Sequence, residues 1–338
     1  MKQTFRFNNS STDFYFSSNI NQLRDIIELK NSIFITDENV YAAQTGKFKN
    51  FKTIIIKAGE QHKTQATVNV IIQKLIEFEA DRKTVLVGVG GGVITDITGY
   101  VASIYMRGIR FGFIPTTLLA LVDASIGGKN GIDIGMYKNI VGVIKQPAFI
   151  FHDLNFLKTL PDNQWRNGFA EIIKHACIKD KEMLKELQYH SIDNYKNTRK
   201  NIDLLVQRNV KIKLKVVQHD ELEQGERKLL NFGHTLGHAL ENQYQLMHGE
   251  AVAIGMSYAA KISEELIGFK DAATVHEVLT IYNLPTNIKF NRDKVFDVMK
   301  MDKKREQKEI NFILLEKIGK GIIYPIAFNQ LKEIIQSL

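Results

Sequence analysis

Thr84-Val-Leu-Val-Gly-Val-Gly-Gly-Gly-Val-Ile-Thr-Asp96 is the stretch of sequence that decides the fold. An apolar run typical of a buried strand leads into Gly88, Gly90, Gly91 and Gly92, and a helical pattern follows. Glycine lets the backbone approach a ligand closely, and a helix start offers free N–H groups. The stretch predicts a dinucleotide pyrophosphate site, although Val93 replaces the last glycine of G-x-G-x-x-G. A tight turn without a ligand is the alternative.

The surrounding sequence predicts the architecture. Strand-like runs at 32–36, 53–56, 84–87 and 111–114 alternate with a helical pattern at 68–78, which indicates a parallel sheet. Beyond residue 155 helical patterns dominate, at 168–179, 181–188, 198–218, 237–245 and 250–266, and strand-like runs return only at 310–315 and 321–324. We therefore expect an α/β, Rossmann-like parallel-sheet domain at residues 1–155 and a mostly α-helical domain at 156–338.

Composition excludes several classes of protein. The 338 residues are 44 % hydrophobic and 24 % charged, which is typical of a globular protein. Cys177 is the only cysteine, so no internal disulfide forms. The N-terminal segment has no apolar core of signal-peptide length, and no apolar run has the length of a membrane span. The net charge of +8 is dispersed and accompanies no nucleic-acid-binding motif. We expect a cytoplasmic protein with neither a nucleic acid nor a membrane as partner.

A second motif runs from Pro115-Thr-Thr to Lys129 and on to Lys138-Asn139. Two threonine hydroxyls follow a predicted strand, where open α/β sheets place their ligands. The acid Asp123, a glycine pair and two lysines come next and suit a phosphorylated or carboxylated substrate. Ordinary surface lysines are the alternative.

The helical part carries residue types that bind metals. They are Glu171, His175, His234, His238, His248 and Glu250. His234 and His238 are four residues apart and so share one helix face, which by spacing alone makes them a ligand pair. Thr235 stands where a zinc metalloprotease has glutamate, so that signature fails. Structural histidines are the alternative.

A charged segment from Lys213 to Asn231 leads into these histidines. Lys213 and Arg227 suit a substrate carboxylate if they point inward, since a guanidinium binds a carboxylate through two hydrogen bonds. The alternative is a solvated helix end and turn.

Taken together, these motifs resemble the 3-dehydroquinate synthase family. The matching segments occur in the family's order and are Glu60-x-x-Lys63, Gly90 to Asp96, Met106-Arg-Gly108, Pro115 to Ala120, Val122 to Lys129, Lys138-Asn139, Ala170 to His175, Asp220 to Arg227, Asn231 to His238, His248 to Gly255 and Asp302-Lys-Lys304. The resemblance extends from about residue 37 to residue 304.

The resemblance implies three sets of site residues. Zinc or cobalt would be bound by Glu171, His234 and His248, which moves His238 to the substrate phosphate region. NAD would be bound by Asp37, Glu60, Lys63, Gly91, Gly92, Asp96, Thr116, Thr117, Asp123, Lys129 and Lys138. The substrate would be bound by Asp123, Lys129, Lys138, Asn139, Lys174, Lys213, Arg227, Asn231, His238 and one lysine of Lys303-Lys304, with Lys129, Lys174, Lys213, Arg227, Asn231 and His238 as catalytic residues. Arg107 would reach the phosphate site of a neighbouring subunit, which implies a homodimer.

The implied reaction converts 3-deoxy-D-arabino-heptulosonate 7-phosphate, a phosphorylated keto-acid sugar, to 3-dehydroquinate and phosphate. A ring hydroxyl is oxidised by NAD, phosphate is eliminated, the ketone is reduced again, and ring opening with an internal aldol closure completes the carbocycle. The alternatives are another sugar phosphate cyclase, a metal-dependent polyol dehydrogenase, or a nucleotide-binding protein without catalysis. Thr95 and Tyr137 each replace a glycine usual in the family, and we expect both in loops.

Overall fold

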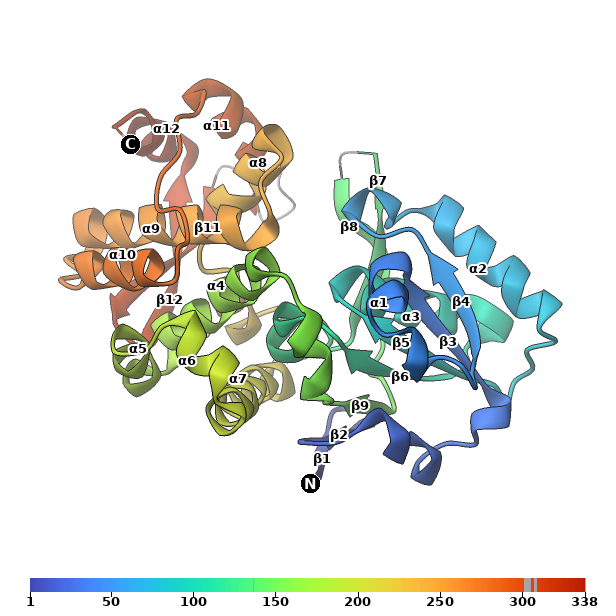
Figure 1. Cartoon of the computed structure of the whole chain (residues 1–338). Coiled ribbons are helices and arrows are strands. Elements are labelled where there is room, and N and C mark those ends of the chain that lie inside the picture. Colours follow the sequence, from blue (N-terminus) through green and yellow to red (C-terminus); the bar gives the residue numbers. More distant parts are fainter. Residues whose placement is uncertain (136, 301–304, 307–308, 338) are drawn as a thin grey trace. The chain divides into compact units, whose positions relative to one another are not determined.

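The computed structural model describes residues 1–135, 137–300, 305–306 and 309–337 (Figure 1). The chain forms two compact units, which we describe separately. The first unit comprises Met1–Gln164 and Asp203–Leu222, and the second comprises Trp165–Ile202 and Glu223–Leu338. This grouping differs from a single division near residue 155, because a segment of the helical half belongs with the sheet unit.

The first unit is built on a seven-stranded sheet with the order β1-β2-β9-β6-β5-β3-β4. The pairs β2–β9, β9–β6, β6–β5, β5–β3 and β3–β4 are parallel, and β1 pairs antiparallel with β2. The strands are β1 (Lys2–Arg6), β2 (Ser11–Tyr15), β3 (Ser32–Asp37), β4 (Lys52–Ile56), β5 (Val85–Gly90), β6 (Arg110–Pro115) and β9 (Phe149–Phe151). A separate antiparallel hairpin consists of β7 (Lys129–Ile134) and β8 (Tyr137–Ile144).

The first unit also contains helices, most of which lie between strands along the chain. They are α1 (Glu38–Ala43), α2 (Gln65–Glu77), α3 (Gly92–Ile104) and most of α7 (Arg199–His219), with the short helices η1 (Ile20–Asp25), η2 (Leu29–Asn31), η3 (Thr45–Lys47), η4 (Glu60–His62), η5 (Tyr105–Arg107), η6 (Ala120–Ala124) and η7 (Leu154–Thr159). Every residue of β5 is buried, as expected for a central parallel strand with both faces covered. The core includes Phe34, Val87, Val89 and Ile114. The predicted parallel-sheet architecture of this half is therefore confirmed.

The second unit is mostly helical. It contains most of α4 (Asp162–Lys179), together with α5 (Lys181–Gln188), α6 (Ile192–Asn197), η8 (Glu226–Asn231), α8 (His234–Tyr244), α9 (His248–Ile267), α10 (Ala272–Ile281), α11 (Arg292–Lys300) and α12 (Phe328–Ser337). Its sheet has the order β10-β11-β12, formed by β10 (Arg305–Glu306), β11 (Glu309–Lys317) and β12 (Lys320–Ala327). Leu240, Ile254, Leu314 and Ile326 belong to its core.

The two positions that depart from the family pattern were expected in loops, and this expectation is wrong. Thr95 lies in α3, because the helix begins directly after the glycine turn, and its buried hydroxyl donates to the carbonyl of Gly92 (2.9 Å). Tyr137 is the first residue of β8 and pairs with Ile134 across the hairpin. Both positions therefore have regular secondary structure.

No helix in the described part of the chain is both long enough and apolar enough to cross a membrane.

Candidate active site

The glycine turn of the first unit has the geometry of an anion-binding site. Strand β5 ends at Gly90 and α3 begins at Gly92, with Gly91 as its N-cap. Because Gly91 has no side chain, the first N–H groups of α3 are not capped by the N-cap residue and can bind an anion. A Cβ atom at Gly91 would lie 3.1 Å from Cγ2 of Thr117, so the turn packs closely on the next strand end. This turn fits a pyrophosphate.

The structure brings other predicted NAD residues to the same edge of the sheet. Asp37 ends β3, and Thr116 and Thr117 follow β6, whose Pro115 pairs with Gly90. The carboxyl ends of neighbouring parallel strands meet at one edge, where α/β folds bind dinucleotides. Burial raises the pKa of Asp37, whose carboxylate accepts the N–H of Val40 (2.9 Å).

Lys63 connects predicted cofactor and substrate residues. Its Nζ donates to Oδ2 of Asp96 and to Oδ1 of Asn139, both at 2.5 Å, and lies 3.8 Å from the Glu60 carboxylate. Burial lowers the pKa of Lys63, but the carboxylates of Asp96 and Glu60 outweigh burial and raise it. Burial raises the pKa of Asp96 to about 6 although Lys63 opposes this shift. Both groups are therefore charged at neutral pH.

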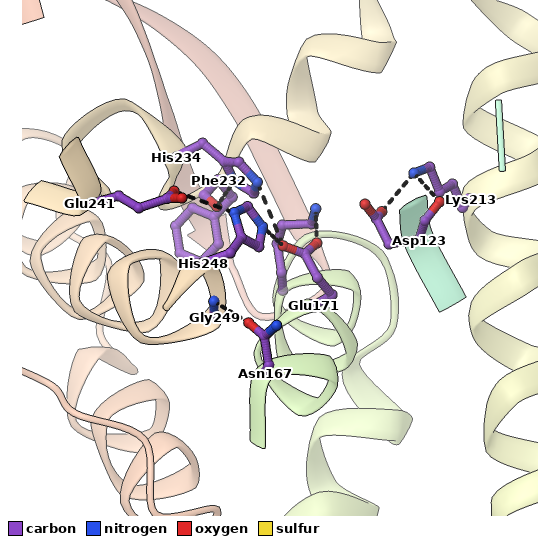
Figure 2. A network of polar contacts seen from close by, with 10 residues as sticks. Asp123, Asn167, Glu171, Lys213, Phe232, His234, Glu241, His248 and Gly249 are labelled. Atoms are coloured by element: carbon purple, nitrogen blue, oxygen red, sulfur yellow. Dashed lines mark hydrogen bonds and ion pairs between the residues drawn. The ribbon is translucent and has the colours of Figure 1, made fainter. Parts of the chain in front are cut away.

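Lys213 points into the first unit and is only 7 % exposed (Figure 2). Its Nζ donates both to the carboxylate and to the backbone carbonyl of Asp123, each at 2.7 Å. The alternative of a solvated helix end therefore does not apply to Lys213. Lys129 and Lys138 lie on the hairpin β7–β8, and Arg107 is exposed in η5.

The second unit brings three potential metal ligands together (Figure 2). Glu171 lies on α4, His234 begins α8 and His248 begins α9, and one ligand atom from each lies within 4.8 Å of the other two. Nε2 of His234 is 3.5 Å and Nε2 of His248 is 3.0 Å from the same oxygen, Oε1 of Glu171. Two imidazoles and a carboxylate are a typical donor set for a divalent transition metal. The arrangement therefore fits a metal ion.

Electrostatics favour a cation at this point. Burial alone lowers the pKa of His248, but hydrogen bonds to Glu171 and Glu241 outweigh burial and raise it to about 10. Glu171 is fully buried, and Lys174, one turn further along α4, forms an ion pair with it.

The remaining predicted residues of this unit have different surroundings. Arg227 is 2 % exposed in η8, and Nδ2 of Asn231 donates to Glu223 (2.6 Å). The His238 ring stacks edge-on against that of His234, 5.1 Å between centroids. His238, Glu241 and His248 form a second set of potential ligands within 4.8 Å. Lys303 and Lys304 lie outside the described residues.

Glu250 and His175 were also candidate metal ligands of the sequence. Glu250 accepts the backbone N–H of Met247 (3.0 Å) and so caps its own helix. His175 is fully buried on α4.

The sequence pattern missed two residues beside the ligands, Glu241 and Asn167. Glu241 is seven residues after His234, and Asn167 is four residues before Glu171, so helical periodicity places each on a ligand-bearing face. That spacing was the available signal, but it does not show which neighbouring helix each residue reaches.

Comparison with known proteins shows the same two-part organisation. Residues 53–167 match the family described as 3-dehydroquinate synthase N-terminal, and residues 168–305 match 3-dehydroquinate synthase C-terminal. The 3-dehydroquinate synthase of Campylobacter concisus is 42 % identical over 276 residues, which cover 80 % of this chain and 79 % of the relative. That of Pyrococcus furiosus is 43 % identical over 284 residues, with 82 % of each chain covered.

Solved structures agree at the level of the whole fold. A 2-deoxy-scyllo-inosose synthase complexed with carbaglucose-6-phosphate, NAD⁺ and Co²⁺ has a TM-score of 0.87 and 26 % identity, with both chains fully covered. A 2-epi-5-epi-valiolone synthase from Streptomyces hygroscopicus with NAD⁺ and Zn²⁺ bound has a TM-score of 0.89 and 25 % identity, with 99 % and 98 % covered. An iron-containing alcohol dehydrogenase from Thermotoga maritima shares the fold alone. It has a TM-score of 0.66 and 14 % identity, with 98 % of this chain and 99 % of that chain covered.

Proposed function

The chain belongs to the 3-dehydroquinate synthase family and is therefore a lyase-class cyclase, and on this basis we propose which of its residues bind NAD, the metal and the substrate. The substrate is 3-deoxy-D-arabino-heptulosonate 7-phosphate, and the products are 3-dehydroquinate and phosphate. The observation that carries the proposal is the convergence of His234 and His248 on one oxygen of Glu171. Solved relatives of the same fold bind NAD⁺ with Co²⁺ or Zn²⁺, which supports NAD and a divalent metal as cofactors.

We assign NAD to the first unit. The uncapped start of α3 binds the pyrophosphate, and Asp37 accepts a ribose hydroxyl from the end of β3. Lys63 carries a positive charge beside this edge and is held by Asp96. The predicted cofactor set is completed by Glu60, Thr116, Thr117, Asp123, Lys129 and Lys138.

We assign a divalent metal, zinc or cobalt, to Glu171, His234 and His248, since three ligands of this type leave a position for substrate. When bound, NAD exchanges a hydride with the substrate and the metal polarises the substrate oxygen. Lys174 lies beside the ligand Glu171 and can orient a substrate oxygen at this point. His238, next to the ligands but outside the set, is assigned to the phosphate.

We assign the substrate carboxylate to two basic residues, Arg227 and Lys213. They are 2 % and 7 % exposed, Lys213 also pairs with Asp123, and a guanidinium such as that of Arg227 binds a carboxylate through two hydrogen bonds. The predicted substrate set is completed by Asp123, Lys129, Lys138, Asn139, Asn231 and one lysine of Lys303-Lys304. A cyclase whose substrate has no carboxylate would make less use of these cations.

The experiment that tests this function is an assay of phosphate release from the seven-carbon substrate in the presence of NAD. We expect phosphate release that stops when a chelator removes the metal and returns when Zn²⁺ or Co²⁺ is added. NADH should not accumulate, because the same cofactor is oxidised again in each turnover. Steady NADH formation from a polyol, without phosphate release, would contradict the proposal and favour a dehydrogenase.

A further inference from the structure

The imidazole of His248 is held between two carboxylates (Figure 2). Its Nε2 lies 3.0 Å from Oε1 of Glu171, and its Nδ1 lies 3.5 Å from Oε2 of Glu241. The Glu241 side chain, on α8, is only 9 % exposed. The nitrogen that faces the ligand Glu171 is therefore distinct from the nitrogen that faces Glu241.

His234 has the same arrangement with a different acceptor. Its Nε2 faces Glu171 and its Nδ1 lies 3.1 Å from the backbone carbonyl of Phe232. A histidine that binds a metal commonly donates its other ring N–H to a carboxylate or a carbonyl, which fixes its tautomer and its orientation. Glu241 occupies for His248 the place that the Phe232 carbonyl occupies for His234.

The backbone beside His248 is held as well. Oδ1 of Asn167, a buried residue one turn before Glu171 on α4, accepts the N–H of Gly249 at 2.5 Å. A Cβ atom at Gly249 would lie 2.6 Å from Cα of Asn167, so α4 and the start of α9 are in direct backbone contact. The Asn167–Gly249 contact thus joins the helix of Glu171 to the helix of His248.

We propose that Glu241 and Asn167 are positioning residues that hold His248 as a metal ligand, an inference that rests on the proposed metal site. The Glu241 carboxylate accepts a hydrogen bond from the Nδ1–H group of His248, and this keeps Nε2 of His248 directed at Glu171. Asn167 fixes the first turn of α9 against α4 and so sets the separation of the two ligands. Neither residue contacts the metal itself.

The test is the affinity for Zn²⁺, measured by competition with a chromophoric chelator. We expect binding to weaken about 10- to 100-fold in Glu241→Ala and in Asn167→Ala, the range typical of outer-shell partners of metal ligands. Glu241→Gln and Asn167→Asp should recover much of this loss, because each keeps an acceptor oxygen at the same place. The visible spectrum of the Co²⁺-substituted protein should change in the alanine variants and be close to wild type in the conservative ones.

Two control variants separate the possible outcomes. Asn209→Ala removes a fully buried helical asparagine whose Nδ2 donates to Leu205 (2.8 Å), and it should lower the unfolding temperature while Zn²⁺ affinity is unchanged. Glu171→Ala should abolish binding at this site, and wild-type affinity in that variant would contradict the proposed metal site itself.

The positioning inference has its own contrary results. It is overturned if Glu171→Ala loses the metal while the Glu241 and Asn167 alanine variants bind it like wild type. It is also overturned for Glu241 if Glu241→Ala and Glu241→Gln both lose the metal completely, because Glu241 would then be a ligand together with His238.

Discussion

Glu171 and His152 are both almost fully buried, yet their surroundings differ. Glu171 faces two imidazoles and forms an ion pair with Lys174. His152 packs edge-on against Phe14 and Phe16, and its ring nitrogens have no hydrogen-bond partner among the described residues. A buried carboxylate among positive or metal-binding groups suits a functional site, whereas a neutral histidine among aromatic rings suits a core.

The metal set gives a prediction at this scale. His248→Ala should abolish turnover and lower the zinc content, because it removes one of three ligands. His238→Ala should impair turnover while the zinc content remains at the wild-type value. Metal analysis of the purified variants measures both. Loss of metal in the His238 variant together with retention in the His248 variant would show that the ligand assignment is wrong.

His152 gives a prediction about pH. Burial lowers its pKa to about 3, and the nearby Asp203 only partly opposes this. In the unfolded chain the pKa is about 6.5, so the unfolded state binds more protons between these values. Neutral, buried His152 therefore costs the fold nothing above pH ~6.5, and the free energy of unfolding decreases as pH falls towards 3. The decrease amounts to about 2–3 kcal/mol at pH ~4.5.

In His152→Phe this contribution is absent. The free energy of unfolding, measured by urea titration at several pH values, should fall less steeply between pH ~6.5 and ~4.5 than in wild type. Equal slopes in the two proteins would contradict a buried, neutral His152.

At the scale of elements, α8 and α9 approach each other through glycines. A Cβ atom at Gly255 of α9 would lie 1.8 Å from the carbonyl oxygen of Gly233, and one at Gly237 would lie 2.8 Å from the carbonyl oxygen of Ala251. Gly233 has a φ of +79°, a left-handed conformation that favours glycine, directly before His234. The close approach brings the starts of both helices, with their histidines, to Glu171.

Gly255→Ala should therefore separate the two helices. We expect about 1–3 kcal/mol of destabilisation from overpacking, together with weaker Zn²⁺ binding. Thermal unfolding and the chelator competition measure the two effects. Gly46→Ala is the matched control, because a Cβ atom there meets nothing within 4 Å. A Gly255→Ala protein with wild-type stability and Zn²⁺ affinity would contradict this account of the close contact.

The periodicity of apolar residues was sufficient to predict some of the strands and helices. The apolar runs at 84–87 and 111–114 became β5 and β6, and the pattern at 181–188 became α5 with the same bounds. Strands β1 and β2 were missed because side chains of their hairpin are partly exposed and lack a continuous apolar run. The hairpin β7–β8 was missed because glycines and lysines occupy it.

At the scale of the whole molecule, the first unit exposes several large apolar side chains. Ile104 ends α3, Met106 lies in η5, and Ile134, Tyr137, Ile140, Val141 and Ile144 lie on the hairpin β7–β8, each between 37 % and 55 % exposed. Arg107 is next to Met106 in sequence, and the family resemblance assigns it to a partner's phosphate site. An exposed apolar surface of this kind marks an interaction site, and we propose a second copy of the chain as its partner.

Ile140→Glu should accordingly shift the protein from dimer to monomer, because it places a charge in an apolar interface. Arg107→Ala should leave the dimer intact and weaken phosphate release, mainly by raising KM for the phosphorylated substrate. Sedimentation velocity and steady-state kinetics measure these two effects. A wild-type protein that is monomeric at all concentrations would contradict the proposed dimer.

The sequence by itself determined the alternation of the central strands with helices, the glycine turn after β5, the mostly helical character of the second half and the types of residue available for chemistry. These features depend on local periodicity and on backbone freedom, which neighbouring residues define. It also contained enough ordered motifs to identify the family. It could not determine from spacing which histidines act together, since the 234/238 pair is the more obvious one on a helix face.

The family resemblance implies that His234 and His248 act together with Glu171, and only the tertiary structure shows the contacts among them. Nε2 of His234 and Nε2 of His248 face one oxygen of Glu171, although these histidines are 63 and 77 residues away from Glu171 in sequence. Glu241 contacts His248 itself, and Asn167 contacts the backbone of Gly249 beside it. The physical reason is that these contacts depend on how three helices pack, and this packing includes a close approach of backbones at Gly233, Gly237, Gly249 and Gly255. Burial, which sets the pKa values of Asp96 and His152, likewise exists only in the folded chain.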